Sequence, residues 1–143
     1  DVEAKYTAVL IWESTCGHCK KEMPIYKELY EEWAPKGLEI FAIGNDFEPE
    51  PWQKFVNEKG YTDWINVSDN PLINAQDSAS VLIYSGITTL KSLNFRTTFD
   101  VFATPKVFLL DKNKKIVAKQ IGAEQMGEIL GRLEDMDKRG IPY

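Results

Sequence analysis

The sequence predicts an α/β domain in which helices flank a central mixed β-sheet. Apolar segments of strand length, at 7–12 and 38–43, lie on either side of a segment with helical periodicity at 16–33. A strand-helix-strand unit of this kind implies parallel pairing, because the helix carries the chain back to begin the second strand in the same direction. Two later apolar segments, at 106–110 and 116–121, are joined by a polar turn of hairpin length and predict an antiparallel pair.

The length and the composition fit one domain covering residues 1–143, which is enough chain to bury a core without staples. The 17 basic and 22 acidic residues, with only short Lys pairs among them, argue against binding of nucleic acid. No segment approaches the length of a membrane span. Because the chain begins at Asp1 without a Met, we expect a domain excised from a longer precursor, whose missing part carries any signal peptide or anchor.

The first strand and the first helix follow each other directly. The segment 7–12 is apolar at nearly every position, as expected when both faces of a strand are covered. Either Ser14 or Thr15 is expected to cap the helix at 16–33, and Pro24 inside this helix predicts a kink. The apolar stripe of the helix has spacings of four and three and consists of Cys19, Met23, Tyr26, Tyr30 and Trp33.

The middle of the chain has a mixed apolar pattern. Pro49 and Pro51 are expected to open a short helix, and the segment 64–67 is expected to be extended. A further helix is expected from Pro71 to about Ser85. After the hairpin, a last helix at about 124–138 is expected to bury five side chains at helical spacing, namely Met126, Ile129, Leu130, Leu133 and Met136.

The only two cysteines, Cys16 and Cys19, are separated by two residues at the first strand-to-helix junction. This layout is typical of a dithiol redox centre. Cys16 lies at the helix N-terminus, where unpaired backbone N–H groups and the helix dipole favour the thiolate, which is the nucleophile in disulfide exchange. Cys19 lies one turn inside the helix, close enough to form a disulfide and release a bound partner.

Two other roles for the cysteine pair compete with redox chemistry. A structural disulfide would close so short a loop that it would constrain the unfolded chain very little. A zinc site with His18, the only histidine, would need four ligands, and no second cluster of ligands exists. We therefore expect a redox-active pair, no metal, and no cofactor other than the Cys16–Cys19 disulfide.

With Thr104-Pro105 directly before the strand at 106–110, the order of elements resembles the thioredoxin fold, a three-layer sandwich around a four-stranded mixed sheet. The match covers nearly the whole chain. The segments WESTCGHCKKEMP and FATPKVFLLDKNKKI look like the TlpA/ResA type of extracytoplasmic, often membrane-tethered thiol-disulfide oxidoreductase. Proteins of this type usually reduce disulfides in the cell envelope, for example during cytochrome c maturation.

The resemblance implies a partner set and a role for each site residue. The partners would be protein disulfides or dithiols and an upstream thiol donor or acceptor. The domain would work in the bacterial periplasm or cell envelope. It would be attached to the membrane only through a missing N-terminal anchor. Cys16 would be the attacking cysteine and Cys19 the resolving one. A cis Pro105 would pack beside the Cys16 sulfur, and the Thr104 backbone would bind an incoming peptide. Trp12 would flank the site, or alternatively pack in the core.

Two features depart from thioredoxins. The buried acid that thioredoxins carry six residues before the first cysteine is replaced by Leu10. Glu22, three residues after Cys19 and on the same helical face, is the candidate for handling its proton, and Glu13 is a second candidate. The stretch at about 70–94 is some twenty residues longer than a compact version of the fold needs, and insertions at such sites often serve partners.

The dipeptide between the cysteines, Gly17-His18, is the one found in protein disulfide isomerases. A histidine at this position can stabilise the Cys16 thiolate and make the disulfide more oxidising, or it can be an inert exposed side chain. Both reduction and oxidation of substrates are compatible with this motif.

The leading function from sequence is thiol-disulfide exchange with protein substrates. The alternative is a partner-binding module that uses the same fold surface, with incidental redox activity. A peroxidase fits poorly, because peroxide-reducing relatives need a lone cysteine supported by Thr and Arg, and no Arg lies near this motif.

Overall fold

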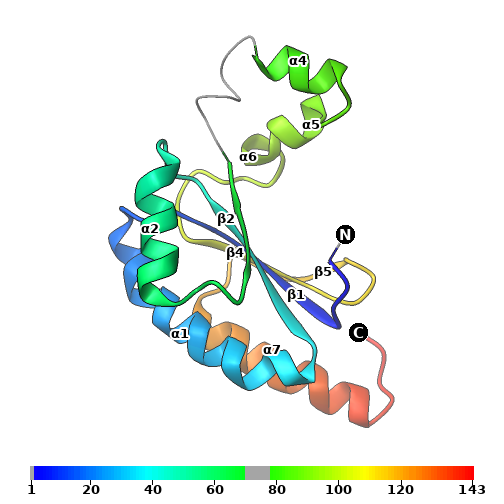
Figure 1. The fold of residues 1–143 in the computed structure, drawn as a ribbon. Coiled ribbons are helices and arrows are strands. Elements are labelled where there is room, and N and C mark those ends of the chain that lie inside the picture. Colours follow the sequence, from blue (N-terminus) through cyan, green and yellow to red (C-terminus); the bar gives the residue numbers. More distant parts are fainter. Residues whose placement is uncertain (1, 70–77) are drawn as a thin grey trace.

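A five-stranded mixed sheet forms the centre of the protein, whose structure is a computed structural model that describes residues 2–69 and 78–143. The central strand is β1 (Tyr6–Trp12), which pairs in parallel with β2 (Leu38–Gly44) and antiparallel with β4 (Lys106–Leu110). The strand order is β3-β2-β1-β4-β5 (Figure 1).

The two outer strands complete the sheet. β3 (Ile65–Ser68) pairs in parallel with β2, and β5 (Ile116–Lys119) pairs antiparallel with β4. The predicted fold class is confirmed, although the sheet has five strands rather than four. The fifth strand is the segment predicted to be extended at 64–67. It was not predicted to be part of the sheet, because an edge strand with half-exposed side chains has no continuous apolar pattern.

Three helices cover one face of the sheet, and a short helix packs against the other. The main core lies between one face of β1 and three helices, α1 (Gly17–Trp33), α2 (Pro49–Lys59) and α7 (Ala123–Lys138). A smaller core on the opposite face is formed by Ile11, Val101 and Phe108, with Phe95 of α6 (Phe95–Thr98) packed against it. The alternating side chains of β1 thus point into two different cores, which explains why nearly every position of this strand is apolar.

The start of α1 differs from the prediction. The N-cap is Cys16, whose sulfur accepts a hydrogen bond from the Cys19 N–H at 3.2 Å. Ser14 and Thr15, the predicted caps, lie before the cap position, so that prediction was wrong. The Ser14 side chain instead donates to the carboxylate of Asp46, and this tertiary hydrogen bond competes with local capping. The helix continues through Pro24 as far as Trp33.

The longer middle segment forms short helices. Its described part contains α4 (Ser78–Tyr84) and α5 (Leu90–Leu93), and α6 follows. The helix predicted from Pro71 to Ser85 lies in part outside the described residues, and its described part is α4. In Figure 1, α4 and α5 lie away from the helices that cover the main core. Among the described residues, no helix combines the length and the apolar character needed to cross a membrane.

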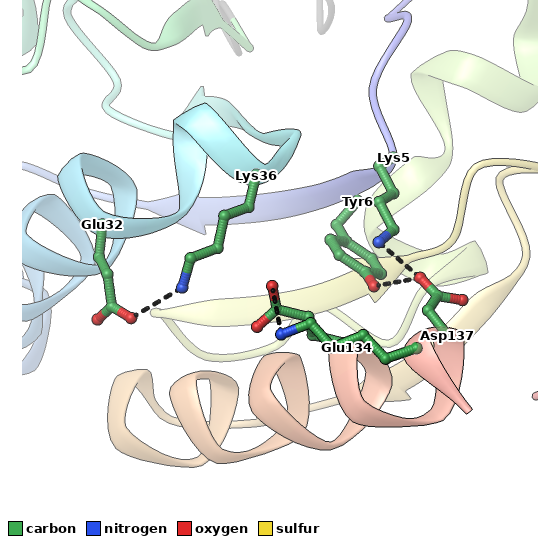
Figure 2. A network of polar contacts seen from close by, with 7 residues as sticks. Lys5, Tyr6, Glu32, Lys36, Glu134 and Asp137 are labelled. Atoms are coloured by element: carbon green, nitrogen blue, oxygen red, sulfur yellow. Dashed lines mark hydrogen bonds and ion pairs between the residues drawn. The ribbon is translucent and has the colours of Figure 1, made fainter. Parts of the chain in front are cut away.

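A polar network joins the beginning of β1 to the end of α7 (Figure 2). Asp137 accepts a hydrogen bond from the Tyr6 hydroxyl at 3.1 Å and pairs with the Lys5 ammonium at 2.6 Å. The hydrogen bond from Lys5 holds the pKa of Asp137 below its usual value, against the opposing effect of burial. Because β1 is seven residues long, this network lies about 20 Å along the strand from the end that leads to the cysteines.

Candidate active site

The cysteine motif begins where β1 ends. The Asn45 N–H donates to the carbonyl of Trp12 at 2.8 Å and fixes the last residue of the strand. The Cys16 N–H then donates to the carbonyl of Glu13 at 3.2 Å and closes a tight turn. This turn places Cys16 at the N-cap of α1 with its side chain partly exposed. Both cysteines are free thiols in the structure.

The Cys16 sulfur lies against a segment that is remote in sequence. Its distance to the carbonyl oxygen of Thr104 is 3.4 Å, and the Thr104–Pro105 peptide bond is cis. Burial by itself raises the pKa of the Cys16 thiol. Hydrogen bonds with the side chains of Cys19 and Thr104, and with the backbone N–H groups of Cys19 and His18, outweigh burial and lower this pKa below its usual value.

Cys19 has the opposite character. It is completely buried in the main core, and burial is the largest cause that raises the pKa of its thiol to about 12. The hydrogen bond with Cys16 raises it further, because it favours the protonated form of Cys19. The pair therefore combines a partly exposed sulfur whose pKa is lowered with a buried sulfur that keeps its proton at neutral pH.

A carboxylate that sequence reasoning missed anchors the turn before Cys16. Asp46, only 8% exposed, accepts hydrogen bonds from the Ser14 N–H at 3.1 and 3.0 Å and another from the Ser14 hydroxyl. Next to it, the Asn45 amide donates to the Glu13 carboxylate at 3.0 Å. A signal was available, because Asn45 and Asp46 directly follow the second strand, and the ends of neighbouring parallel strands meet at one edge of the sheet.

Glu22 lies between two helices. Its Oε2 atom accepts hydrogen bonds from the Tyr26 hydroxyl at 2.9 Å and from the Ala123 N–H at 3.2 Å. Ala123 is the first residue of α7, so the carboxylate meets the positive end of that helix. Within the described part of the chain, no hydrogen bond joins Glu22 to Cys19, which is one helical turn away.

The remaining predicted residues fall into two groups. Gly17 and His18 are exposed between the cysteines. Trp12 is completely buried and packs against Phe55, with ring centroids 5.5 Å apart. The structure therefore corresponds to the core-packing alternative for Trp12 and gives this side chain no surface for a substrate. Leu10, at the position of the thioredoxin acid, is also a core residue.

A family model described as Redoxin matches residues 1–137. The chain belongs to the Redoxin family. This family, together with the mixed sheet and the cysteine motif at the start of α1, confirms the thioredoxin-like resemblance of the sequence.

Curated relatives of this Redoxin chain carry the name thiol-disulfide oxidoreductase ResA. The proteins from Bacillus thuringiensis (strain Al Hakam) and from Bacillus anthracis are each 27% identical over 134 residues. Each alignment covers 94% of this chain and 65% of the relative. The chain thus spans just under two thirds of the length of these relatives.

Solved structures share the fold of this Redoxin chain. A domain of a possible thiol-disulfide isomerase from Cytophaga hutchinsonii has 34% sequence identity and a TM-score of 0.74, covering 97% of this chain and 82% of that chain. The thioredoxin domain of a thiol-disulfide oxidoreductase from Bacteroides vulgatus has 23% identity and a TM-score of 0.68, covering 92% and 80%. At 23% identity the likeness is one of fold alone.

The candidate site of this Redoxin chain is built around two thiol groups. Within residues 2–69 and 78–143, no group of three or more His, Cys, Asp or Glu side chains could hold a metal ion. The structure brings together Cys16, Cys19 and Thr104, of which the last is 88 residues away from Cys16 in sequence. It places Glu22 one turn further along α1, with a partner on α7.

Proposed function

We propose that this chain is a thiol-disulfide oxidoreductase that exchanges electrons with protein disulfides or dithiols through Cys16 and Cys19. The observation that carries the proposal is the opposite character of the two thiols. Cys16 is partly exposed and has a lowered pKa, whereas burial raises the pKa of Cys19 to about 12. The names of the curated relatives and the Redoxin family support the same reaction.

The reaction proceeds by two exchanges. The Cys16 thiolate attacks one sulfur of the substrate disulfide, the substrate S–S bond breaks, and the other substrate sulfur leaves as a thiolate. Cys19 then loses its proton and attacks the Cys16 sulfur. This step forms the Cys16–Cys19 disulfide, breaks the mixed disulfide and releases the substrate as a dithiol, so two electrons pass to the substrate. Oxidation of a dithiol is the same sequence in reverse.

Other residues act around this exchange. The backbone of Thr104, next to Pro105, binds the substrate peptide beside the Cys16 sulfur, which it contacts in the structure. Glu22 accepts the proton that Cys19 loses. His18, with Gly17 beside it, tunes the stability of the Cys16 thiolate. The dithiol itself carries the electrons, so the reaction needs no further cofactor.

The compartment and the partners of this domain are proposed from the resemblance of its motifs to those of TlpA/ResA-type proteins. The domain works outside the cytoplasm, in the periplasm or cell envelope. It exchanges electrons with a protein substrate on one side and with an upstream thiol donor or acceptor on the other.

Reduction of insulin with dithiothreitol as the electron source tests the proposal. The parent protein is expected to accelerate the reaction, and Cys16→Ser is expected to abolish the acceleration. Cys19→Ser is expected to accumulate a mixed disulfide with the substrate, detectable by mass spectrometry, because the resolving sulfur is gone.

Two results would contradict the proposal. Equal trapping of substrate by Cys16→Ser and Cys19→Ser would contradict the assignment of the attacking sulfur. A folded parent protein without any reductase activity would favour the alternative of a partner-binding module.

A further inference from the structure

The two oxygens of the Glu22 carboxylate have different surroundings. Oε2 accepts both hydrogen bonds, from the Tyr26 hydroxyl at 2.9 Å and from the Ala123 N–H at 3.2 Å. Both oxygens also lie near Gly122, since a Cβ atom added there would be 3.6 Å from Oε1 and 3.9 Å from Oε2. A cavity of about 430 Å³ adjoins the carboxylate and is lined by Glu22, Ile25, Gly122, Ala123, Glu124 and Gln125. Oε2 is therefore the oxygen held by hydrogen bonds, and among the described residues none is donated to Oε1.

Tyr26 is a buried polar residue without a role in the reaction as described above. It is 1% exposed and belongs to the same core cluster as Cys19, two helical turns away on the same stripe of α1. Its hydroxyl has a second acceptor, the Ile121 carbonyl, at 3.5 Å. Because one O–H donates best to the nearer and charged acceptor, the bond to Glu22 is the stronger of the two.

The Tyr26 hydroxyl remains a donor through the working pH range. Burial is the largest cause that raises the pKa of Tyr26, followed by the hydrogen bond to Glu22 and by the negative charges of Glu22 and Cys19.

The N-terminus of α7, like the Tyr26 hydroxyl, interacts favourably with the negative charge of the Glu22 carboxylate. Its first N–H has no partner inside the helix, and the helix dipole favours a negative charge there. Glu124, in the first turn of α7, lines the cavity and carries the opposing like charge. The Tyr26 hydroxyl and the Ala123 N–H thus both donate to Oε2, and Glu124 lies on the side of the cavity.

We propose that Tyr26 is a positioning residue for the resolving step, because it fixes Oε2 of Glu22 and leaves Oε1 to receive the proton from Cys19. The proposal rests on the proposed function of Glu22. In this step the S–H bond of Cys19 breaks and the S–S bond to Cys16 forms. The substrate sulfur leaves with the electron pair of the mixed disulfide, and the proton ends on Oε1 of Glu22.

Single-turnover kinetics with a peptide disulfide, measured from about pH 5 to 9, test the role of Tyr26. Tyr26→Phe keeps the buried ring and removes only the hydroxyl. It is expected to slow release of the mixed disulfide about tenfold, the effect of losing a hydrogen bond to a charged group. The acid limb of the release rate is expected to move to higher pH, while the attack by Cys16 is unchanged.

Two further variants isolate the effect. Tyr30→Phe removes a hydroxyl from the same helix, where it donates to the Asp63 carbonyl at 3.1 Å, and is expected to leave both steps unchanged. The double variant Tyr26→Phe with Glu22→Gln is expected to release substrate no more slowly than Glu22→Gln alone, because Tyr26 acts only through Glu22. The ratio of release to attack is independent of the folded fraction, since both steps occur in the same folded molecules.

The outcomes separate this inference from the function on which it rests. If Glu22→Gln slows release and Tyr26→Phe does not, Glu22 keeps its role and the inference about Tyr26 is wrong. If Glu22→Gln releases the substrate as fast as the parent protein, the proposed role of Glu22 is wrong, and the inference about Tyr26 is wrong with it. If Tyr26→Phe slows attack and release equally without moving the acid limb, Tyr26 has a structural role only.

Discussion

At the scale of single residues, burial and hydrogen bonding give two identical side chains opposite acidities. Cys16 is the N-cap of α1, and four hydrogen bonds lower its pKa although burial opposes them. Cys19 is three residues further on and completely buried, and its pKa is raised to about 12. In the proposed function, this difference assigns the attack on the substrate to Cys16 and the resolving step to Cys19.

Alkylation with iodoacetamide as a function of pH is expected to show this difference. Because the pKa of Cys16 is lowered, its labelling rate should reach half of its maximum at a lower pH than that of an ordinary thiol, which a small free thiol labelled in parallel measures. Because the pKa of Cys19 is about 12, this thiol should stay unlabelled throughout the neutral range. Peptide mapping of the labelled protein measures both rates. Equal labelling of the two thiols at pH 8 would contradict the assignment.

A pair of variants at His18 separates the imidazole from the backbone. The backbone N–H of His18 lowers the pKa of Cys16, whereas the side chain is exposed. His18→Pro removes both groups, and His18→Ala removes only the imidazole. If the imidazole stabilises the thiolate, His18→Ala should shift the redox potential against glutathione in the reducing direction by about 30 mV, and His18→Pro should shift it further.

The control for this prediction is the pKa of Cys16 in the same two variants. An unchanged potential in His18→Ala, with a shift in His18→Pro alone, would assign the whole effect to the backbone N–H. The tuning role proposed for the His18 side chain would then be wrong.

At the scale of elements, close packing of α2 against the end of β2 holds the loop that anchors the site. Gly44 is the last residue of β2 and precedes Asn45 and Asp46 directly. A Cβ atom at Gly44 would overlap the indole of Trp52 in α2. Only a glycine allows this helix to approach the strand so closely.

Gly44→Ala is therefore expected to lower the free energy of unfolding by about 1–3 kcal/mol, the usual cost of overpacking. Gly131→Ala is the matched control, because Gly131 is exposed in the middle of α7 and a Cβ there would meet no atom within 4 Å. This variant should raise the stability by up to about 1 kcal/mol, the difference in helix propensity. Urea unfolding measures both values. Equal effects of the two substitutions would contradict the packing argument.

Local patterns made most elements predictable from the sequence. The apolar stretch of β1 and the helical spacing of α1 and α7 gave bounds within a few residues of those observed. The cap of α1 was not predictable, because Ser14 bonds to Asp46, 32 residues away. In the site, the spacing of Cys16 and Cys19 was sufficient to predict that the two thiols lie together at the start of α1.

Long-range contacts explain what the sequence could not show about the site. Glu22 was identified from its spacing to Cys19, but its partner Ala123 is 101 residues away and no local pattern links them. Trp12 had two possible roles, because an apolar residue before a reactive motif can face either the solvent or the core. Its register in β1 decides this, since it lies on the same face as Leu10 and Ala8.

At the scale of the whole molecule, the site and the polar network of Asp137 lie at opposite ends of β1. The network joins the first strand to the last helix, so it contributes to stability without contact to the cysteines. The Lys5 and Asp137 side chains are 40% and 33% exposed, which limits the contribution of this ion pair to about 1 kcal/mol or less.

Asp137→Asn is expected to lower the free energy of unfolding by this amount at pH 7. The lowered pKa of Asp137 means that its contribution is fully present above the unfolded value of about 3.9 and is lost as the pH falls through the folded value. Parent and variant should therefore differ in urea unfolding at pH 7 and converge below about pH 3. The alkylation rate of Cys16 should be the same in both. A changed rate would contradict the independence of the two ends.

The capping of α1 by Cys16 also makes the oxidation state of the protein visible in its backbone. The amide proton of Cys19 points at the Cys16 sulfur, which is negatively charged as a thiolate and uncharged in a disulfide. Its chemical shift in an NMR spectrum therefore follows the charge on that atom. A redox titration can be read at this one amide, in the unmodified protein and without any attached probe.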